Sequence, residues 1–271
     1  MSTLRTDLPI MVQGRSTTDP RRVFRQSMAI CRRNLLHMRG APIQLVSMAL
    51  FPMLIGIVLI SVFGGAIGHG RLDYKTFVLP GITFQTVAVA SRLTGVWLNL
   101  DFTSGMMDRL RSFPIARSSV LVGRIIADLC RMAIAFVVMI AFGFAIGFRA
   151  PGGPLAVVGS MLLMVGLGMA LCWVSACIGL FLRRPQSVQM AASLWMMPLQ
   201  FFSSMFVPPE TMPGWLRGFA EVNPVTLVCD ASRALMSGAD ATGPVLGTIG
   251  WIIGTTVVFG PLAVMQYGRR I

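Results

Sequence analysis

Residues 155–182, LAVVGSMLLMVGLGMALCWVSACIGLFL, decide the fold, because this run of 28 residues contains no charged side chain. A helix needs about 20 predominantly apolar residues to cross the ~30 Å hydrocarbon core of a bilayer. Five further apolar runs of similar length occur in the chain, at about 42–64, 77–99, 125–148, 186–207 and 244–267. We therefore predict an all-α polytopic membrane protein with six transmembrane helices.

The composition excludes an ordinary soluble domain. Of the 271 residues, 55% are hydrophobic and only 12% are charged, whereas charged residues make up roughly a quarter of a soluble domain. The net charge of +13 comes from 23 basic residues that lie mainly in short segments between the apolar runs. No platform of interleaved aromatic and basic residues accompanies them, so we expect contact with membrane lipids and no binding of nucleic acid.

The distribution of the basic residues predicts the orientation. Segments on the cytoplasmic side of a membrane are enriched in Lys and Arg. With a cytoplasmic N-terminus, sixteen basic residues lie inside and five lie outside. Residues 1–41 carry eight Arg and no apolar core, which is not the pattern of a cleaved signal peptide. We predict cytoplasmic N- and C-termini and a multi-pass protein of the bacterial inner (plasma) membrane.

The chain before the first span divides into two parts. Residues 1–18 are polar and without period, so we expect a disordered cytoplasmic tail. In residues 19–40, apolar side chains recur at helical spacing among Arg residues, which predicts an amphipathic helix in the plane of the membrane interface. The alternative is a charged tail that only fixes the topology. Residues 41–271 form the predicted transmembrane domain.

The first cytoplasmic loop, about 101–124, has the pattern of a short amphipathic helix. Asp101 can cap such a helix and Pro114 can end it. Between them stand the apolar and basic side chains Met106, Met107, Arg109, Leu110, Arg111 and Phe113. A helix that presents such side chains to the cytoplasm is suited to a groove on another protein. The alternative is a helix folded back onto the bilayer surface.

The segment at about 208–243 contains four prolines and is too interrupted to cross the membrane. Its apolar spacing predicts two short helices, one around Trp215 and one over 225–236. Irregular backbone at membrane depth persists only where protein covers it. We expect both helices to dip in from the outer side and pack on the bundle; a solvent-exposed loop is the alternative.

Charged residues inside membrane spans are rare and costly, so they are candidates for function. Arg124, Asp128 and Arg131 are spaced i, i+4 and i+7, which predicts a salt ladder on one helix face at the inner end of the bundle. Arg92 lies about two turns from the inner end of its span. We favour a structural ladder at the inner gate over a proton relay.

Uncharged polar residues in the second and fifth spans either join helices by hydrogen bonds or line a substrate route. The candidates are Thr83, Gln85, Thr86, Gln189, Ser193, Gln200 and Ser204. Four glycines in the fourth span, at 159, 166, 168 and 179, predict close helix packing. The five cysteines and two histidines form no metal-binding pattern, so we predict no metal site.

The chain lacks the GxxxxGK[ST] motif that cradles nucleotide phosphates. If it transports against a gradient, ATP and Mg²⁺ must bind to a separate partner. We expect no cofactor on this chain and no enzymatic activity of its own.

Three segments resemble the permease subunits of type-2 ATP-binding-cassette exporters, particularly the daunorubicin-resistance permeases for drugs and lipids. They are GMMDRLRSFPIARS at 105–118 with GR at 123–124, FVPPETMPGWL at 206–216, and Asn223-Pro224 leading to RAL at 233–235. The resemblance covers essentially residues 20–271. It implies that 102–113 is a coupling helix seated in the ATPase, 20–39 an interfacial connecting helix, and 208–236 re-entrant helices.

The resemblance further implies an assembly of two permeases and two ATPases, with the route between the second and fifth spans of both permeases. We expect the transmembrane subunit of an exporter for lipophilic drugs or lipids, hence a role in multidrug or antibiotic resistance. The second permease is either identical or a homologue. The alternative function is an intramembrane enzyme or a membrane scaffold without ATP coupling.

Overall fold

The computed structural model describes residues 42–67, 74–103 and 117–270, and all regular structure in these ranges is helical. The helices are α2 (Pro42–Ile67), α3 (Tyr74–Thr103), α5 (Arg117–Ala145), α6 (Gly153–Phe181), α7 (Pro185–Phe201), the short 3-10 helix η1 (Pro209–Thr211), α8 (Gly214–Val222), α9 (Pro224–Ser237) and α10 (Thr242–Arg270). The predicted tail 1–18 and interfacial helix 19–40 lie outside the described residues, as does the loop segment 104–116.

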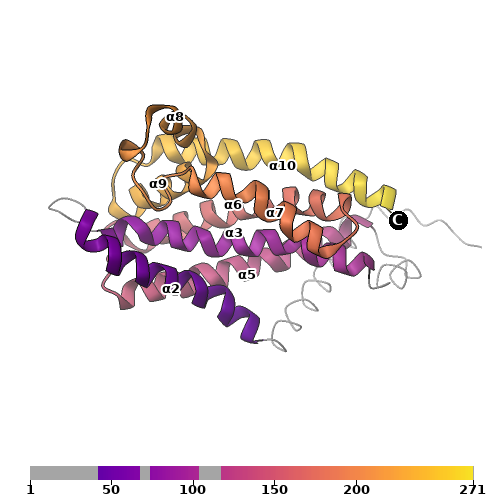
Figure 1. Cartoon of the computed structure of the whole chain (residues 1–271), viewed down its shortest axis with the longest axis horizontal. Helices are drawn as coiled ribbons and strands as arrows, with labels where there is room; N and C mark the ends of the chain where they lie inside the picture. The colour runs from indigo at the N-terminus through magenta and orange to yellow at the C-terminus, as the bar shows by residue number, and fades with distance from the viewer. Residues whose placement is uncertain (1–41, 68–73, 104–116, 271) are drawn as a thin grey trace, which may run out of the picture.

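The six long helices run along the long axis of the molecule, and the short helices α8 and α9 lie at one end (Figure 1). Successive long helices alternate in direction. The last residues of α3 and α10 therefore lie at the opposite end of the bundle from α8 and α9, together with the first residues of α5. One end of the bundle therefore carries the short helices α8 and α9, and the other carries the end of α3 and the start of α5.

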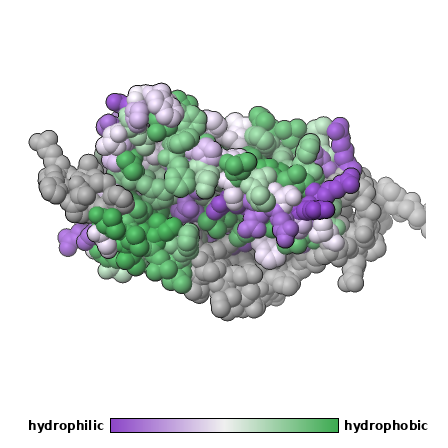
Figure 2. Space-filling model, in the orientation of Figure 1, coloured by the Kyte–Doolittle hydropathy of each residue, from purple (hydrophilic) through white to green (hydrophobic). Residues whose placement is uncertain are grey.

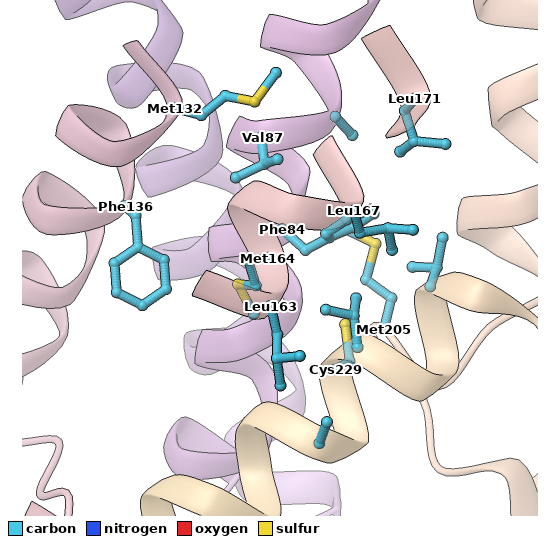
Figure 3. Packing of buried hydrophobic residues seen from close by; sticks show 14 of the residues in the cluster. Phe84, Val87, Met132, Phe136, Leu163, Met164, Leu167, Leu171, Met205 and Cys229 are labelled. Carbon is cyan, nitrogen blue, oxygen red and sulfur yellow. The ribbon is translucent and has the colours of Figure 1, made fainter. Parts of the chain in front are cut away.

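Helix α6 is the centre of the core. Its Leu163, Met164 and Leu167 lie between α3 and α9, where they meet Phe84 and Cys229 (Figure 3). Met164 and Phe84 are fully buried, as is the side chain of Met205 beyond the end of α7. The core thus joins long helices to a short helix that begins 23 residues after α7 ends.

Glycines bring α3 and α6 into backbone contact. A Cβ atom on Gly179 would meet the carbonyl oxygen of Gly95, and one on Gly95 would meet the carbonyl oxygen of Ser175. A Cβ atom on Gly168 would meet Val87 and Met132. The close packing predicted for the glycines of the fourth span is confirmed at Gly168 and Gly179.

Among the described residues, three helical segments are long and apolar enough to cross a membrane: 123–145, 153–181 and 242–269. In addition, 50–62 is a shorter apolar segment within α2. Helix α3 packs along both α5 and α6 over its length and carries more polar residues than they do. These helices make the chain a multi-pass membrane protein.

The predicted fifth span, 186–207, is longer than the helix that forms. Helix α7 ends at Phe201, after 17 residues or about 26 Å. The side chain of Asn223 donates hydrogen bonds to the carbonyls of Leu199 and Phe202, both at 2.8 Å. Asn223 is the N-cap residue of α9. Because its side chain satisfies these carbonyls, α7 can end at Phe201 and not at residue 207.

Candidate functional site

A polar cluster lies inside the bundle where α3, α5 and α6 meet, in the half that contains the end of α3 and the start of α5. Thr94 on α3 donates a hydrogen bond of 2.6 Å to the carboxylate of Asp128 on α5. Asp128 is only 1% exposed and forms an ion pair with Arg131. The sulfur of Cys172 on α6 lies 3.3 Å from the Thr94 hydroxyl oxygen. Side chains from all three helices therefore contribute to a single buried cluster.

The predicted salt ladder forms in part: Asp128 and Arg131 pair as the spacing suggested, but Arg124 has a different partner. Arg131 pairs with Asp128, whereas Arg124 forms a 2.6 Å ion pair with Asp101 on α3. Asp101 was expected to cap a helix in the loop, but α3 continues to Thr103 and Asp101 lies within its last turn. The Asp101–Arg124 pair links the last turn of α3 to the first part of α5.

Asn99 of α3 joins this helix to the end of α6 by hydrogen bonds. Its side-chain amide donates to the carbonyls of Gly179 and Leu182, at 2.9 and 2.6 Å. These carbonyls belong to the end of α6, where backbone acceptors lack partners within the helix. Neither Thr94 nor Asn99 was recognised from the sequence. Thr94 lies seven residues before Asp101, and Asn99 lies seven residues after Arg92, so the members of each pair share one face of α3. This spacing was the signal that the sequence offered for them.

A second polar cluster lies at the opposite end, around Arg233 on α9. The Arg233 guanidinium donates to the carbonyl of Phe77 at 2.9 Å and to that of Ser204 at 2.7 Å. It also pairs with Asp230 at 2.5 Å and lies 3.8 Å from the centroid of the Phe77 ring. Arg233 thus joins the start of α3, the chain after α7, and α9. From the sequence, Arg233 was part of the RAL motif at 233–235 that carries the family resemblance, and its contacts were not predicted.

The candidate route residues fall into two groups. Four are enclosed within this chain: Thr83, Thr86, Gln200 and Ser204. Thr83 and Thr86 donate to carbonyls one turn back in α3, and Ser204 donates to Asp230.

Gln85, Ser193 and Gln189 are at least partly exposed, and Ser193 accepts a 3.4 Å hydrogen bond from Arg92. Figure 2 shows a band of hydrophilic residues across the middle of one face of the molecule, between hydrophobic areas. Arg92 and Ser193 bring α3 and α7 together within this polar surface.

The predicted docking side chains Met106, Met107, Arg109, Leu110, Arg111 and Phe113 lie outside the described residues. The two helices that flank them, α3 and α5, pack against each other and are tied by the Asp101–Arg124 pair. Within the described ranges, no three side chains of His, Cys, Asp or Glu are grouped as metal ligands.

Comparison with known proteins identifies the family. Residues 25–237 match the family model described as ABC-2 type transporter. Over 238 residues the chain is 34% identical to the daunorubicin resistance ABC transporter permease protein DrrB1 of Streptomyces coeruleorubidus, which covers 88% of this chain and 84% of that protein.

It is also 26% identical to the probable doxorubicin resistance ABC transporter permease protein DrrC of Mycobacterium tuberculosis, over 82% of this chain and 81% of that one. The probable multidrug ABC transporter permease YbhR of Escherichia coli is 22% identical over 74% of this chain and 54% of its own length. The chain therefore belongs to the ABC-2 type transporter family.

Proposed function

We propose that this chain is the transmembrane permease subunit of an ATP-binding-cassette exporter that moves lipophilic drugs or lipids out of a bacterial cell. In this proposal, six helices cross the plasma membrane, both termini are cytoplasmic, and the loop 104–116 faces the cytoplasm. A separate ATPase subunit binds ATP and Mg²⁺. Two permeases, identical or homologous, and two ATPases make up the working assembly.

The observation that carries the proposal is the extent of the family match, because it includes both long helices that flank the predicted coupling segment. The relatives are named as ABC permeases for daunorubicin, doxorubicin or several drugs. A permease of this class needs a mechanical link to its ATPase. The segment with Met106, Leu110 and Phe113 supplies the apolar side chains for such a link.

The inner ion pairs support a mechanical role for this segment. When an ATPase moves the loop, the displacement enters α3 through Thr103 and α5 through Arg117. The Asp101–Arg124 pair joins these helices, and the Thr94–Asp128 hydrogen bond joins them again about 10 Å farther along α3. We infer that α3 and α5 move as one unit. The ATPase changes the equilibrium only through different contacts in the inward and outward states.

The exposed polar residues of α3 and α7 line the proposed cargo route. Gln85, Gln189 and Ser193 are accessible on this chain, and a second permease placed against the same face would enclose them. Thr83, Thr86, Gln200 and Ser204 would reach the cargo only if α3 and α7 separate during transport. The many methionines, 20 in the chain, suit cargo of varied shape because the thioether side chain is flexible.

The proposal is tested by export and by recovery of the partner. The double substitution Leu110→Ala with Phe113→Ala removes two apolar side chains from the coupling segment. We expect it to abolish drug export and to release the ATPase from the detergent-solubilised complex. Leu155→Ala changes an exposed leucine at the other end of the bundle and serves as the matched control.

Two results would overturn the proposal: no ATPase accompanies the purified wild-type protein, or the double variant exports as well as the Leu155→Ala control. Either result favours the alternative of a membrane enzyme or scaffold that does not use ATP.

A further inference from the structure

Arg92 is a cation within a membrane-spanning helix for which the described residues supply no counter-ion. Its only hydrogen bond there is the 3.4 Å contact with the hydroxyl of Ser193, and no carboxylate lies within ion-pair distance. By contrast, Arg124, Arg131 and Arg233 each have an acidic partner. An arginine at membrane depth is costly unless its charge is compensated.

A second identical chain would not supply the missing charge. Of the ten acidic residues in the sequence, only Asp128 falls within one of the six apolar runs. Asp128 is buried behind α3 and paired with Arg131. Among the described residues, neither this chain nor an identical copy offers an acidic side chain for Arg92, which leaves its charge available to an anion from another molecule.

Arg92 lies on the one accessible stripe of α3. From Val78 to Asn99, the only residues of this helix that are not buried are Gln85, Val89, Arg92, Leu93, Val96 and Trp97. Their spacing of three to four residues places them on one face. Arg92 is the single charge on this face, and apolar side chains surround it. A head group that carries charge on an apolar tail matches this pattern.

Arg92 lies well away from the ion pair at the end of α3. It lies nine residues from Asp101, or about 13 Å along α3 from the inner ion pair. Side chains in a helix lean toward its N-terminus, which for α3 is the end opposite the Asp101–Arg124 pair. The guanidinium is held at Ser193, about 12 Å along α7 from Pro185. An anion that binds Arg92 must therefore enter the face between α3 and α7.

The donors around Arg92 fit a phosphate group. The guanidinium presents several N–H donors in a planar fork that matches phosphate oxygens. The Ser193 hydroxyl accepts from Arg92, and its own proton has no acceptor among the described residues. Gln189 lies one turn away on α7, with an exposed amide. Three donors from two helices are thus available to one anion.

We propose that Arg92, Ser193 and Gln189 form a binding site for the phosphate head group of an anionic lipid, with the acyl chains lying along the apolar residues of the α3 stripe. The site requires that the chain spans a membrane. It does not require the export proposal, because binding involves neither the ATPase nor the loop 104–116.

Photo-crosslinking tests this site on the full-length protein. The protein is placed in phosphatidylcholine vesicles that contain photoactivatable phosphatidylglycerol, and labelled peptides of α3 and α7 are measured by mass spectrometry. A photoactivatable diacylglycerol with the same acyl chains lacks the phosphate and is the control probe. The test variants are Arg92→Gln and Arg92→Lys. The matched control is Arg183→Gln, which removes an exposed charge just after the end of α6.

We expect Arg92→Gln to lower labelling by phosphatidylglycerol on the order of tenfold, the loss that corresponds to one charge-assisted contact. Arg92→Lys should keep part of the labelling, because lysine keeps the positive charge but lacks the planar set of donors of the guanidinium. Labelling by diacylglycerol should be unchanged in every variant, which also shows that the variants are folded.

Three results would overturn the site: wild-type labelling in Arg92→Gln, an equal loss in Arg183→Gln, or displacement of the lipid by excess inorganic phosphate. The second result would indicate general attraction to surface charge, and the third a site for a free anion. Drug export is scored separately in cells. Retained export with no lipid labelling would refute this site alone, whereas lipid labelling without export would refute only the proposed function.

Discussion

Asp128 is the most enclosed charge among the described residues, and its neighbours show how one residue can organise three helices. Its carboxylate accepts from Thr94 of α3 and pairs with Arg131 of its own helix, and the Thr94 hydroxyl also contacts Cys172 of α6. A buried ion pair contributes little net stability compared with apolar residues, but the loss of one partner leaves the other charge uncompensated. The cluster is therefore sensitive to single substitutions.

We predict that Asp128→Asn lowers the free energy of unfolding by about 3 kcal/mol, because Arg131 then stays buried without a counter-ion. Unfolding in mixed micelles measures this change. Glu221→Gln breaks the exposed pair with Arg217 and is the control, with an expected effect below about 1 kcal/mol. The double substitution Asp128→Leu with Arg131→Met should recover stability. Equal stability of Asp128→Asn and Glu221→Gln would contradict the assigned role.

Arg233 is a second residue that joins separate parts of the chain. Its donors satisfy the carbonyls of Phe77 and Ser204, which lie at the start of α3 and just beyond α7. We predict that Arg233→Met lowers the free energy of unfolding by about 2 kcal/mol, since buried acceptors lose their donors. Hydrogen exchange over 202–207 should accelerate. Arg217→Met, on the exposed face of α8, should leave that exchange unchanged; the same acceleration there would refute the prediction.

At the scale of helices, the contact between α3 and α6 is set by glycine. Gly95 and Gly179 face each other so closely that a Cβ atom on Gly179 would meet the Gly95 carbonyl. Small residues let helix backbones approach in a membrane and increase van der Waals contact between them. Asn99 then bonds the end of α6 from the same stretch of α3. Backbone contact thus sets the distance between the two helices, and the hydrogen bonds of Asn99 fix their relative position further.

We predict that Gly179→Ala destabilises the bundle by about 1–3 kcal/mol, because α3 and α6 must move apart to admit the methyl group. Gly254→Ala is the matched control, since a Cβ atom there meets no other atom within 4 Å. That substitution should be neutral or slightly stabilising, as alanine favours helix more than glycine does. Thermal unfolding in detergent compares the two. A Gly179→Ala variant as stable as the control would show that the helices are not in contact in solution.

The helices themselves could be predicted from the sequence, because long apolar runs and the spacing around 155–182 are local signals. The short helices α8 and α9 also followed from local spacing. The partners of the charges could not be predicted. Arg124 and Asp128 are one turn apart on α5, yet Arg124 bonds Asp101 on another helix. Helical spacing states which residues share a face, not which helix lies opposite that face.

The end of α7 shows the same limit. The apolar run continues to residue 207, but the helix stops at Phe201 because Asn223, 21 residues beyond Phe202, satisfies the terminal carbonyls. Residues Thr94 and Arg233 were likewise missed, since each acts through contacts distant in sequence. Of the candidate route, the sequence indicated polar residues in the second and fifth spans; the structure separates the exposed ones from those buried within this chain.

For the whole molecule, function depends on which end of the bundle faces the cytoplasm. One end holds α8, α9 and the Arg233 cluster, and the other holds the Asp101–Arg124 pair beside the loop 104–116 (Figure 1). The surplus of basic residues at the second end predicts that it is inside. The proposed coupling to an ATPase is possible only in this orientation.

The most direct test places a single cysteine at Leu110 in a chain whose five native cysteines are replaced by serine. A second protein carries its single cysteine at Glu210, at the opposite end. Both are treated with a membrane-impermeant maleimide. Our account predicts that intact cells label position 210 and not 110, and that inverted vesicles reverse the pattern. Labelling of position 110 on intact cells would contradict the orientation and, with it, the proposed coupling to a cytoplasmic ATPase.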